Sequence, residues 1–527
     1  MNGKIWGLRW NRWLAVLAGT WAIFPSSKVQ AGDVASNPDP ILQLMLEKGM
    51  ITESEAARVQ AESDARRTNN IATPDISKWK IEDGLGIKSI ELFGDVRLRY
   101  ENRTASDPNS GDINLQRYRY AVRIGLRGDV FNDFYYGLRL QTSQNARSQF
   151  VTFGSSPNGG PFNNNENNGA GMEVGQVYVG WKPEDWVNVT VGKMPNPIFT
   201  TPMVWSMNLS PEGAAERFKH TVGDADFFAT FAQFVYQDTN PYSTPQGYFN
   251  NTYYNSYSPL LLAWQGGVNY HITKKISLKI APVLYNYAGN GVNSGGSYSP
   301  GYPGPYVGQG TTKGVNGVSA YYNFPGSGQN SFNGFAANQT GINNLLVLEF
   351  PVELNVELKE HSLRFFGDYA QNLQGGNRAE AAYNASQNLT LYPPTAFIAP
   401  IPFAQTHDTT AYQAGIAFGS KDCLGLVNGT VSKRNAWEIR TYWQHIEQYS
   451  LDPNLIDTDF FNGLENMQGV YVGLAYGFAN NIIGTLRYGY ASRINSNLGT
   501  GGSSQDIPQM NPVNSYNLFQ ADLTFRF

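Results

Sequence analysis

Apolar and polar residues alternate with a period of two in sixteen successive segments that begin at Ser89 and reach the C-terminus. In the first of them, Val96, Leu98 and Tyr100 alternate with charged residues. Successive side chains of a strand point to opposite faces, so each segment predicts a strand with one apolar and one polar face. Most segments reach the ~9–11 residues with which a tilted strand crosses a bilayer, whereas strands of soluble proteins average about 5–6 residues. The segments lie at 89–100, 117–127, 134–141, 172–182, 186–194, 213–221, 226–237, 260–272, 276–288, 343–358, 361–373, 408–420, 434–449, 466–478, 481–494 and 515–527.

Long and short connections alternate between these segments. Long loops follow the odd-numbered segments, and the longest is 289–342. Short periplasmic turns and long external loops are typical of outer-membrane barrels, and an even strand count with one polar face implies closure around a polar lumen. We therefore predict an all-β membrane fold, a closed antiparallel transmembrane β-barrel of about 16 strands over residues 89–527. Short turns follow the even-numbered segments at 131–133, 183–185, 222–225, 273–275, 359–360 and 479–480, and only 421–433 is longer.

Residues 1–31 have the organisation of a signal peptide. Three basic residues precede an uncharged, mainly apolar run at 13–24, and Ala31 ends a stretch with small residues at the cleavage positions. The run spans about 18 Å as a helix, which is too short for the hydrocarbon core, so we expect cleavage after Sec export. Residues 32–88 predict a periplasmic helical hairpin and linker, because Thr52 and Glu55 form a capping box within a pattern of helical spacing.

The composition excludes several other classes of protein. Only 15% of the residues are charged and the net charge is −4, which argues against a coiled coil, a charged disordered chain and a nucleic-acid-binding protein. The single cysteine, Cys423, excludes an intrachain disulfide and a cysteine-rich metal site. The five histidines are scattered and no P-loop or nucleophile elbow is present, so we expect no enzyme, no cofactor and no metal centre. Acidic residues at Asp452 to Asp459 leave a loop calcium site open, although the EF-hand glycine and spacing are missing.

Two groups of charged residues are expected to line the lumen. Glu349, Glu353 and Glu357 share one face of the tenth segment, which lies almost opposite the first in a ring of sixteen. Opposed acidic and basic walls would set a transverse field across the pore, and the alternative is a solvated charged face with no role in selection. Seven arginines on the polar face of the first three segments predict the basic wall: Arg97, Arg99, Arg117, Arg119, Arg123, Arg127 and Arg139.

The loop at 195–212 follows the fifth segment and is the third outward loop. Its apolar residues are unusual for a solvated loop, and its prolines stiffen it. We expect it to fold inward as a constriction, and the alternative is a loop that lies over a subunit interface. The candidate constriction residues are Pro195, Asn196, Pro197, Phe199, Trp205 and Glu212.

Several stretches resemble the bacterial "putative porin" family of outer-membrane proteins. They include Gly-Asp-Val-Arg-Leu-Arg-Tyr at 94–100, Gly-Lys-Met-Pro-Asn-Pro at 192–197, Leu-Ser-Pro-Glu-Gly at 209–213, Phe-Gly-Asp-Tyr at 366–369, Tyr-Gln-Ala-Gly at 412–415 and the closing strand 516–527 with its terminal aromatic residue. The helical preface is similar too, so the resemblance covers nearly all of the chain after the signal peptide. It implies a general diffusion pore and names no solute. At 205–208 the chain has Trp-Ser-Met-Asn where the family carries acids, so no cation preference is implied.

Together these observations predict an outer-membrane porin of a Gram-negative-type bacterium, a passive channel for small hydrophilic solutes and ions with a basic lumen wall. Its expected partners are outer-membrane lipid, the solutes and further copies of itself in a homotrimer, with no nucleic acid. The alternative is an outer-membrane adhesin or surface-structural barrel with no transport role. A barrel enzyme would need a Ser–His or Asp–His constellation at the lipid rim, and an energised transporter would need a plug domain.

Overall fold

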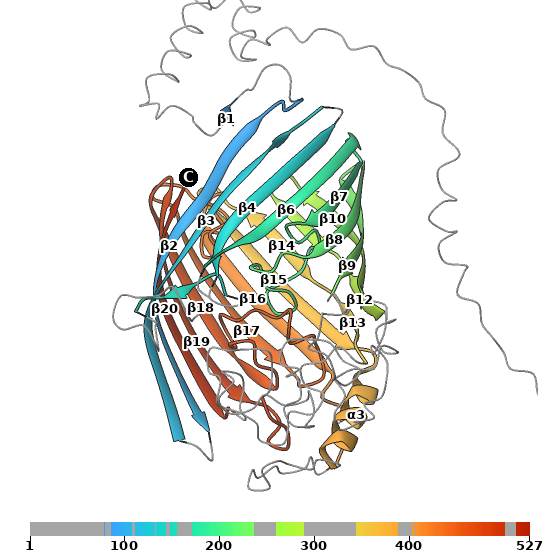
Figure 1. Cartoon of the computed structure of the whole chain (residues 1–527), viewed down its shortest axis with the longest axis vertical. Coiled ribbons are helices and arrows are strands. Elements are labelled where there is room, and N and C mark those ends of the chain that lie inside the picture. Colours follow the sequence, from blue (N-terminus) through green and yellow to red (C-terminus); the bar gives the residue numbers. More distant parts are fainter. Residues whose placement is uncertain are drawn as a thin grey trace, which may run out of the picture. The chain divides into compact units, whose positions relative to one another are not determined.

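Sixteen antiparallel strands close into a barrel in the computed structural model of the chain (Figure 1). The structure describes residues 78–79, 86–107, 111–131, 133–143, 148–154, 171–236, 260–288, 344–387, 403–404, 406–500 and 513–527. The strands are β2 (Ile90–Asp107), β3 (Gly111–Asp129), β4 (Phe134–Ser143), β6 (Gly171–Glu184), β7 (Val187–Lys193), β8 (Glu212–Val222), β9 (Ala225–Val235), β10 (Leu260–Thr273), β11 with β12 (Ile276–Ile280 and Val283–Ala288), β13 with β14 (Leu346–Glu349 and Val352–Glu357), β15 (His361–Asn372), β16 (Thr410–Ser420), β17 (Trp437–Ile446), β18 (Met467–Ala479), β19 (Ile482–Arg493) and β20 (Ser515–Arg526).

Two neighbouring strands of the barrel are each broken once. Pro282 separates β11 from β12, and Pro351 separates β13 from β14, because proline has no N–H to give to the ladder. The pieces still pair in one register, since β11 pairs with β14 and β12 pairs with β13. Each broken pair therefore counts as one crossing of the wall. Two further pieces, β1 (Lys78–Trp79) and β5 (Val151–Thr152), add short pairings to β2 and β3.

The first and last strands close the ring. β2 pairs with β20 from Asp95 opposite Arg526 to Ser106 opposite Ser515. Gly94 N donates to the Phe527 carbonyl at 3.0 Å, and Phe527 N donates back to the Gly94 carbonyl at 3.1 Å. Closure leaves no unpaired edge in the sheet, which removes the tendency of an exposed edge to pair with other chains. The predicted closed antiparallel barrel of sixteen strands is confirmed.

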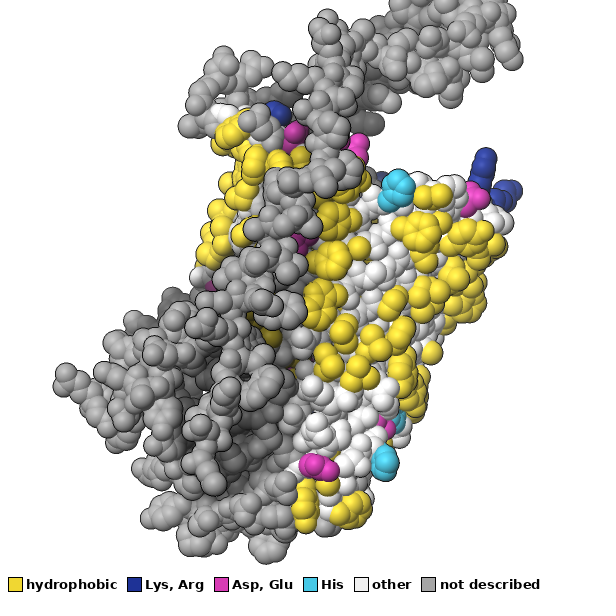
Figure 2. All heavy atoms as spheres, turned by 90° about the vertical axis from the view of Figure 1, so that its right-hand side faces the viewer, with side chains coloured by type: hydrophobic (Ala, Val, Ile, Leu, Met, Phe, Trp, Pro, Cys, Tyr) yellow, Lys and Arg dark blue, Asp and Glu magenta, His cyan; other side chains and the backbone are white. Residues whose placement is uncertain are grey.

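The outer surface of the barrel is apolar. Leu98, Ile124, Val179 and Phe231 are 42–52% exposed although they lie in the middle of strands. Figure 2 shows such hydrophobic side chains spread over one side of the wall. Their strand neighbours, such as Arg97 and Arg123, point the other way, into the lumen, because side chains alternate along a strand. This arrangement, apolar outside and polar inside, is that of a transmembrane barrel.

Some expectations differ from the structure or lie outside the part that it describes. The expected signal peptide at 1–31, the helical hairpin within 32–88 and the long loop at 289–342 lie outside the described residues. In the expected linker, Lys78 and Trp79 form β1. A helix that the sequence pattern did not indicate, α3 (Gly375–Gln387), follows β15. Within the described residues no helix has the length and apolarity needed to span a bilayer.

Candidate pore constriction

The third loop, residues 194–211 between β7 and β8, lies inside the barrel. Asn196 Oδ1 accepts a hydrogen bond from the backbone of Ile198 at 3.0 Å, which fixes the turn between the prolines. Phe199 N donates to Gln265 Oε1 at 2.9 Å, and Gln265 Nε2 donates back to the Phe199 carbonyl at 2.7 Å. Gln265 is a buried residue on the lumen face of β10, so the loop contacts the wall from within.

Two threonines of the third loop donate hydrogen bonds to strands that lie further along the barrel wall. Thr200 Oγ1 donates to Glu349 Oε1 of β13 at 2.7 Å, and the hydroxyl of Tyr285 donates to the other oxygen of the same carboxylate at 2.8 Å. Thr201 Oγ1 donates to Asp368 of β15. The loop is therefore tied from β7 and β8 to β10, β13 and β15 inside the lumen. This is the inward course that its apolar residues led us to expect; that it narrows the pore stays a prediction.

The rest of the third loop packs in an apolar cluster within the barrel. Trp205 is buried, with its ring 5.8 Å from that of Phe234 and 6.2 Å from that of Tyr285. A second loop reaches the same cluster: Phe460 and Phe461 of the seventh outward loop, residues 447–466, are buried in it. Sequence reasoning missed the inward course of the seventh loop, although adjacent phenylalanines in an outward loop are the same kind of signal that we used for the third.

The seventh loop is bonded to the third. Ser206 N donates to the Leu455 carbonyl at 2.6 Å, and Asp457 N donates to the Pro202 carbonyl at 3.0 Å. Ser206 Oγ donates to Asp457 Oδ1 at 3.0 Å. The two loops therefore form one body in the lumen, fixed to several strands of the wall.

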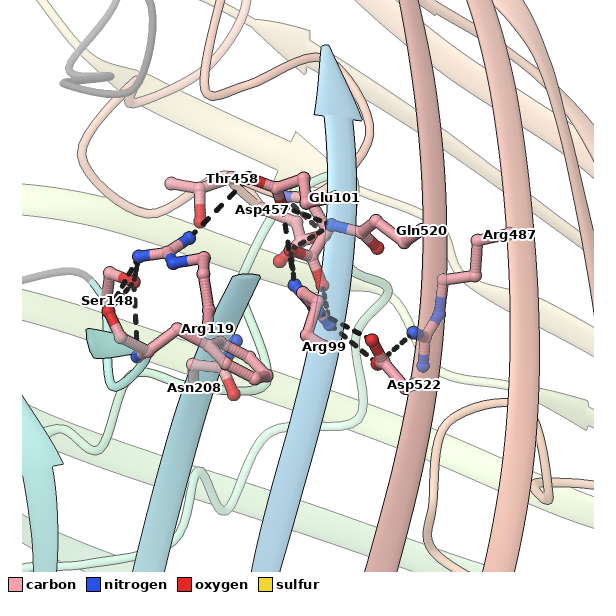
Figure 3. Close-up of polar contacts among 12 residues, drawn as sticks. Arg99, Glu101, Arg119, Ser148, Asn208, Asp457, Thr458, Arg487, Gln520 and Asp522 are labelled. Carbon is pink, nitrogen blue, oxygen red and sulfur yellow. Dashed lines mark hydrogen bonds and ion pairs between the residues drawn. The ribbon is translucent and has the colours of Figure 1, made fainter. Parts of the chain in front are cut away.

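A buried charge network fastens the seventh loop to the strands of the closure (Figure 3). Arg99 Nε donates to Asp522 Oδ1 at 2.8 Å, and Arg99 Nη1 donates to Asp459 Oδ1 of the loop at 2.8 Å. Arg487 of β19 contacts the same Asp522. Burial alone would raise the pKa of Asp459, but the charges of Arg99, Arg487 and Arg103 outweigh it and hold the pKa well below its ordinary value. Asp459 is therefore an ionised anchor at neutral pH.

Glu101, on the lumen face of β2, is the acceptor at the centre of a second part of this network. Arg117 Nε donates to Glu101 Oε1 at 2.7 Å, and Arg103 Nη2 donates to Oε2 at 3.0 Å. Arg119 Nη2 donates to the Phe150 carbonyl at 2.6 Å and to Ser148 Oγ at 2.8 Å, which fastens the loop after β4. The Arg99 and Arg119 side chains are each 2% exposed. Arg99 and Arg119 thus differ from the expected open wall: they are packed under the loops that they hold. Arg117, whose side chain is 12% exposed, pairs with Glu101 within the wall.

The remaining arginines of the expected basic wall behave differently. Arg97 Nε donates to Asp95 Oδ1 at 3.0 Å, and Arg123 Nε donates to Asp95 Oδ2 at 2.8 Å, while both side chains keep 16–17% of their surface exposed. Arg139 and Arg526 lie close enough to interact electrostatically with the same carboxylate. Two arginines therefore pair with one carboxylate, and two more lie within its electrostatic range. We call these five residues the Asp95 cluster.

Arg127 lies apart from this cluster, nearer the end of the barrel that carries the short turns. It forms an ion pair with Glu91, with Nη2 2.7 Å from Oε1, and its side chain is 51% exposed. Its charge is balanced locally, so it adds little to the field in the lumen.

The expected acidic wall on the tenth crossing is not an open surface. Glu349 is fully buried under Thr200, and Glu353 lies 3.5 Å from Arg364 Nη1. Glu357 is exposed at the last residue of β14. Glu212 is also displaced from its expected place: it begins β8, opposite Lys193 with the two charges 3.0 Å apart, on the face shared by the exposed Val191. Glu212 therefore lies outside the constriction.

The acidic residues at Asp452 to Asp459 are engaged in fixing the seventh loop. The hydroxyl of Tyr287 donates to Asp452 Oδ2 at 2.6 Å, and Asn454 N donates to Oδ1 of the same carboxylate at 2.9 Å. Among the described residues, no group of three or more histidine, cysteine or acidic side chains is placed to hold a metal ion.

A cavity of about 540 Å³ lies in the lumen beside the third loop. Its lining includes three cations that sequence reasoning did not single out, Arg217, Lys219 and Lys279, together with Phe199 of the third loop. The signal was present, because Arg217 and Lys219 flank Phe218 in an alternating segment and so share the lumen face of β8.

Solved structures of outer-membrane proteins match the chain at low sequence identity. The anion-selective porin of Comamonas acidovorans has 9% identity over 83% of this chain and 99% of its own, with a TM-score of 0.40. The outer-membrane channel DcaP of Acinetobacter baumannii has 9% identity over 85% and 99%, with a TM-score of 0.38. OmpT of Vibrio cholerae has 10% identity over 85% and 100%, also with a TM-score of 0.38.

Sequence comparison identifies the family. A search of curated proteins finds no match to the chain. The sequence model of the family described as "Putative porin" matches residues 109–299 and 319–527, which together make up more than half of the chain. The matched segments contain most strands of the barrel and both inward loops. The chain belongs to the "Putative porin" family.

Proposed function

We propose that the protein is a passive outer-membrane channel for small hydrophilic solutes that prefers anions. The family and the barrel support a channel rather than an enzyme and support an outer-membrane location. The observation that carries the anion preference is the Asp95 cluster, in which two arginines pair with one carboxylate on partly exposed lumen wall and two more arginines lie within its electrostatic range. An anion that passes this wall is attracted, and a cation is repelled.

The size of the preference follows from Coulomb's law. One unit charge at about 10 Å in water contributes roughly 0.4 kcal/mol, and less after screening by salt. The cluster has three more positive than negative charges, which gives on the order of 1 kcal/mol and a several-fold preference. The preference should be largest in dilute salt and should fade near 1 M, where the Debye length is about 3 Å.

The test is the zero-current potential across a potassium chloride gradient in a planar bilayer. The combined Arg97→Gln, Arg123→Gln and Arg139→Gln variant should lose most of the anion preference, because it leaves one arginine to balance Asp95. Arg127→Gln is the matched control, since Arg127 is balanced by Glu91. A wild type that prefers cations would overturn the proposed selectivity. So would a triple variant with the same zero-current potential as the wild type.

The apolar cluster in the lumen favours a second candidate function. Trp205 of the third loop and Phe460 of the seventh are buried together inside the barrel, and a barrel closed by such loops would serve as an adhesin or surface-structural protein. The same bilayer experiment separates the two functions. A correctly folded protein that never conducts would support the structural barrel, and stepwise single-channel currents would exclude it.

A further inference from the structure

A second group of cations lies on the lumen wall formed by β8 to β11. Arg217 and Lys279 line the cavity of about 540 Å³, with Phe199 and Phe228 beside them. The cavity lies within the 300–1,000 Å³ that small-molecule sites usually occupy. These residues belong to strands other than those of the Asp95 cluster, so they are not needed for the anion preference proposed above.

The ammonium group of Lys279 is held by aromatic rings. Lys279 Nζ lies 3.5 Å from the ring centroid of Phe199 and 5.2 Å from that of Phe228. Its neighbour across the strands is Glu353, but Glu353 pairs with Arg364. A cation–π contact stabilises an ammonium group without cancelling its charge. Lys279 therefore presents a positive charge at the edge of an aromatic surface.

A glycine makes room for that aromatic surface. Phe228 lies opposite Gly267 of β10, and a Cβ atom at Gly267 would lie 2.3 Å from Cζ of the Phe228 ring. The ring therefore extends over the glycine on the lumen side of the wall. Lys219 is the partner of Phe228 on the other side, in β8. Phe228 thus lies between two lysines, with Arg217 two residues along the same strand.

The nearby carboxylates are already engaged. Asp226 lies 4.0 Å from Lys219 Nζ and 3.2 Å from His271 Nε2, and Asp185 lies 3.0 Å from Lys182 Nζ. Neither Arg217 nor Lys279 takes part in an ion pair among the described residues. The wall of the cavity therefore has, among the described residues, two cations that form no ion pair and lie beside an apolar ring.

We propose that this cavity is a binding subsite for small organic acids that join a carboxylate to an aromatic ring. The proposal rests on the proposed channel function, because the acid reaches the cavity through the lumen. The carboxylate would accept hydrogen bonds from Arg217 or Lys279, and an arginine can give two parallel bonds to one carboxylate. The ring of the acid would pack on Phe228 and Phe199, where offset or edge-to-face contacts between aromatic rings are favourable.

The test measures benzoate binding to the full-length mature protein in detergent by isothermal titration calorimetry. Acetate has the charge without the ring, and benzyl alcohol has the ring without the charge. Benzoate should bind more tightly than either. The double variant Arg217→Gln with Lys279→Gln should weaken benzoate binding about tenfold or more, as expected for the loss of charge-assisted hydrogen bonds. Phe228→Leu should weaken benzoate binding while leaving acetate unchanged.

The triple variant of the Asp95 cluster is the matched control, because it removes three cations of the same lumen. It should keep the benzoate affinity while losing the anion preference, and each variant is first shown to fold by its heat-modifiable migration in SDS. Equal binding of benzoate and acetate, or wild-type affinity in the double variant, would overturn the subsite even if the channel prefers anions. Benzoate binding to a barrel that carries no current would instead overturn the channel and leave the subsite standing.

Discussion

At the scale of single residues, the arginines of β2 and β3 differ in how many carboxylates lie beside them. Arg99 lies two residues from Glu101 on the same face and opposite Asp522 of β20, so it is enclosed by carboxylates. Arg97 forms its ion pair with Asp95, which it shares with Arg123. The alternation predicted which residues share the lumen face, because side-chain direction depends on sequence spacing alone. It did not predict that Asp459 of a distant loop completes the network, since no local pattern specifies that contact.

Arg99→Met should loosen the seventh loop. The change removes the arginine that Asp522 and Asp459 share and leaves Asp522 with Arg487 alone, and breaking a buried ion pair costs about 3–5 kcal/mol. We expect noisier single-channel currents and a lower temperature for loss of the folded band in SDS. Arg127→Met is the control, because an exposed pair is worth about 0–1 kcal/mol. Equal behaviour of the two variants would mean that the network does not hold the loop.

The seventh loop should stay anchored down to acidic pH. The pKa of Asp459 in the folded protein lies well below its ordinary value of 3.8, because Arg99, Arg487 and Arg103 outweigh the effect of burial. For a carboxylate with a lowered pKa, the stabilisation is complete above the ordinary value and is lost as the pH falls below it. Channel noise should therefore be unchanged from pH 7 to 5 and should rise only below about pH 3.8. Asp459→Asn should give the noisy currents already at pH 7, and a transition centred between pH 5 and 6 in the wild type would contradict this account.

At the scale of elements, the strands were predictable and the loops only in part. The alternation in 466–478 anticipates β18 (Met467–Ala479), because a half-buried strand must alternate. Helix α3 was missed because Gly375 and Gly376 open it and its apolar residues form no stripe at helical spacing. The anchoring of Thr200 on Glu349 joins residues far apart in the sequence, so only the folded barrel reveals it. The apolar composition of the third loop indicated that the loop is buried, but it did not indicate which strands the loop contacts.

Removing the anchors of the third loop should enlarge the pore. The double variant Thr200→Val and Thr201→Val deletes the donors to Glu349 and Asp368, and a buried acceptor left without its partner costs about 1–3 kcal/mol. We expect a higher single-channel conductance, and a larger increase when residues 195–208 are deleted. Thr273→Val at a short turn is the control. Unchanged conductance in a folded deletion variant would mean that the third loop does not constrict the pore.

At the scale of the whole molecule, closure was predictable and the charge balance was not. Sixteen crossings with one polar face require a ring around a lumen, and the pairing of β2 with β20 satisfies that requirement. The strength of the lumen field depends on which arginines keep a free charge, and this is set by contacts across the ring such as Arg99 with Asp522. The expected homotrimer likewise depends on the outer surface, where a carboxylate in the middle of β8 departs from the apolar pattern.

Glu216 carries that carboxylate, and it offers a test of whether the β8–β9 face is a subunit contact. It lies within β8 on the outward face, opposite Val189 and Phe231, and Gln233 Nε2 donates to its Oε2 at 3.4 Å. Facing lipid, its charge would be unfavourable, although by less than the ~2–4 kcal/mol of an arginine or lysine at mid-bilayer. Facing a polar group of a neighbouring subunit, the same carboxylate would be stabilising.

The sign of the effect of Glu216→Leu therefore distinguishes the two situations. If the β8–β9 face is a subunit contact, the wild type should migrate as a trimer in mild detergent, and Glu216→Leu should give more monomer because Gln233 and the partner lose a polar contact. If Glu216 faces lipid, the leucine should instead make the barrel more resistant to heat and leave the assembly unchanged, because it removes a charge from the apolar band. Phe519→Leu, on the exposed outer face of β20, is the control. Analytical ultracentrifugation in matched-density detergent measures the mass, and a monomeric wild type would reject the trimer.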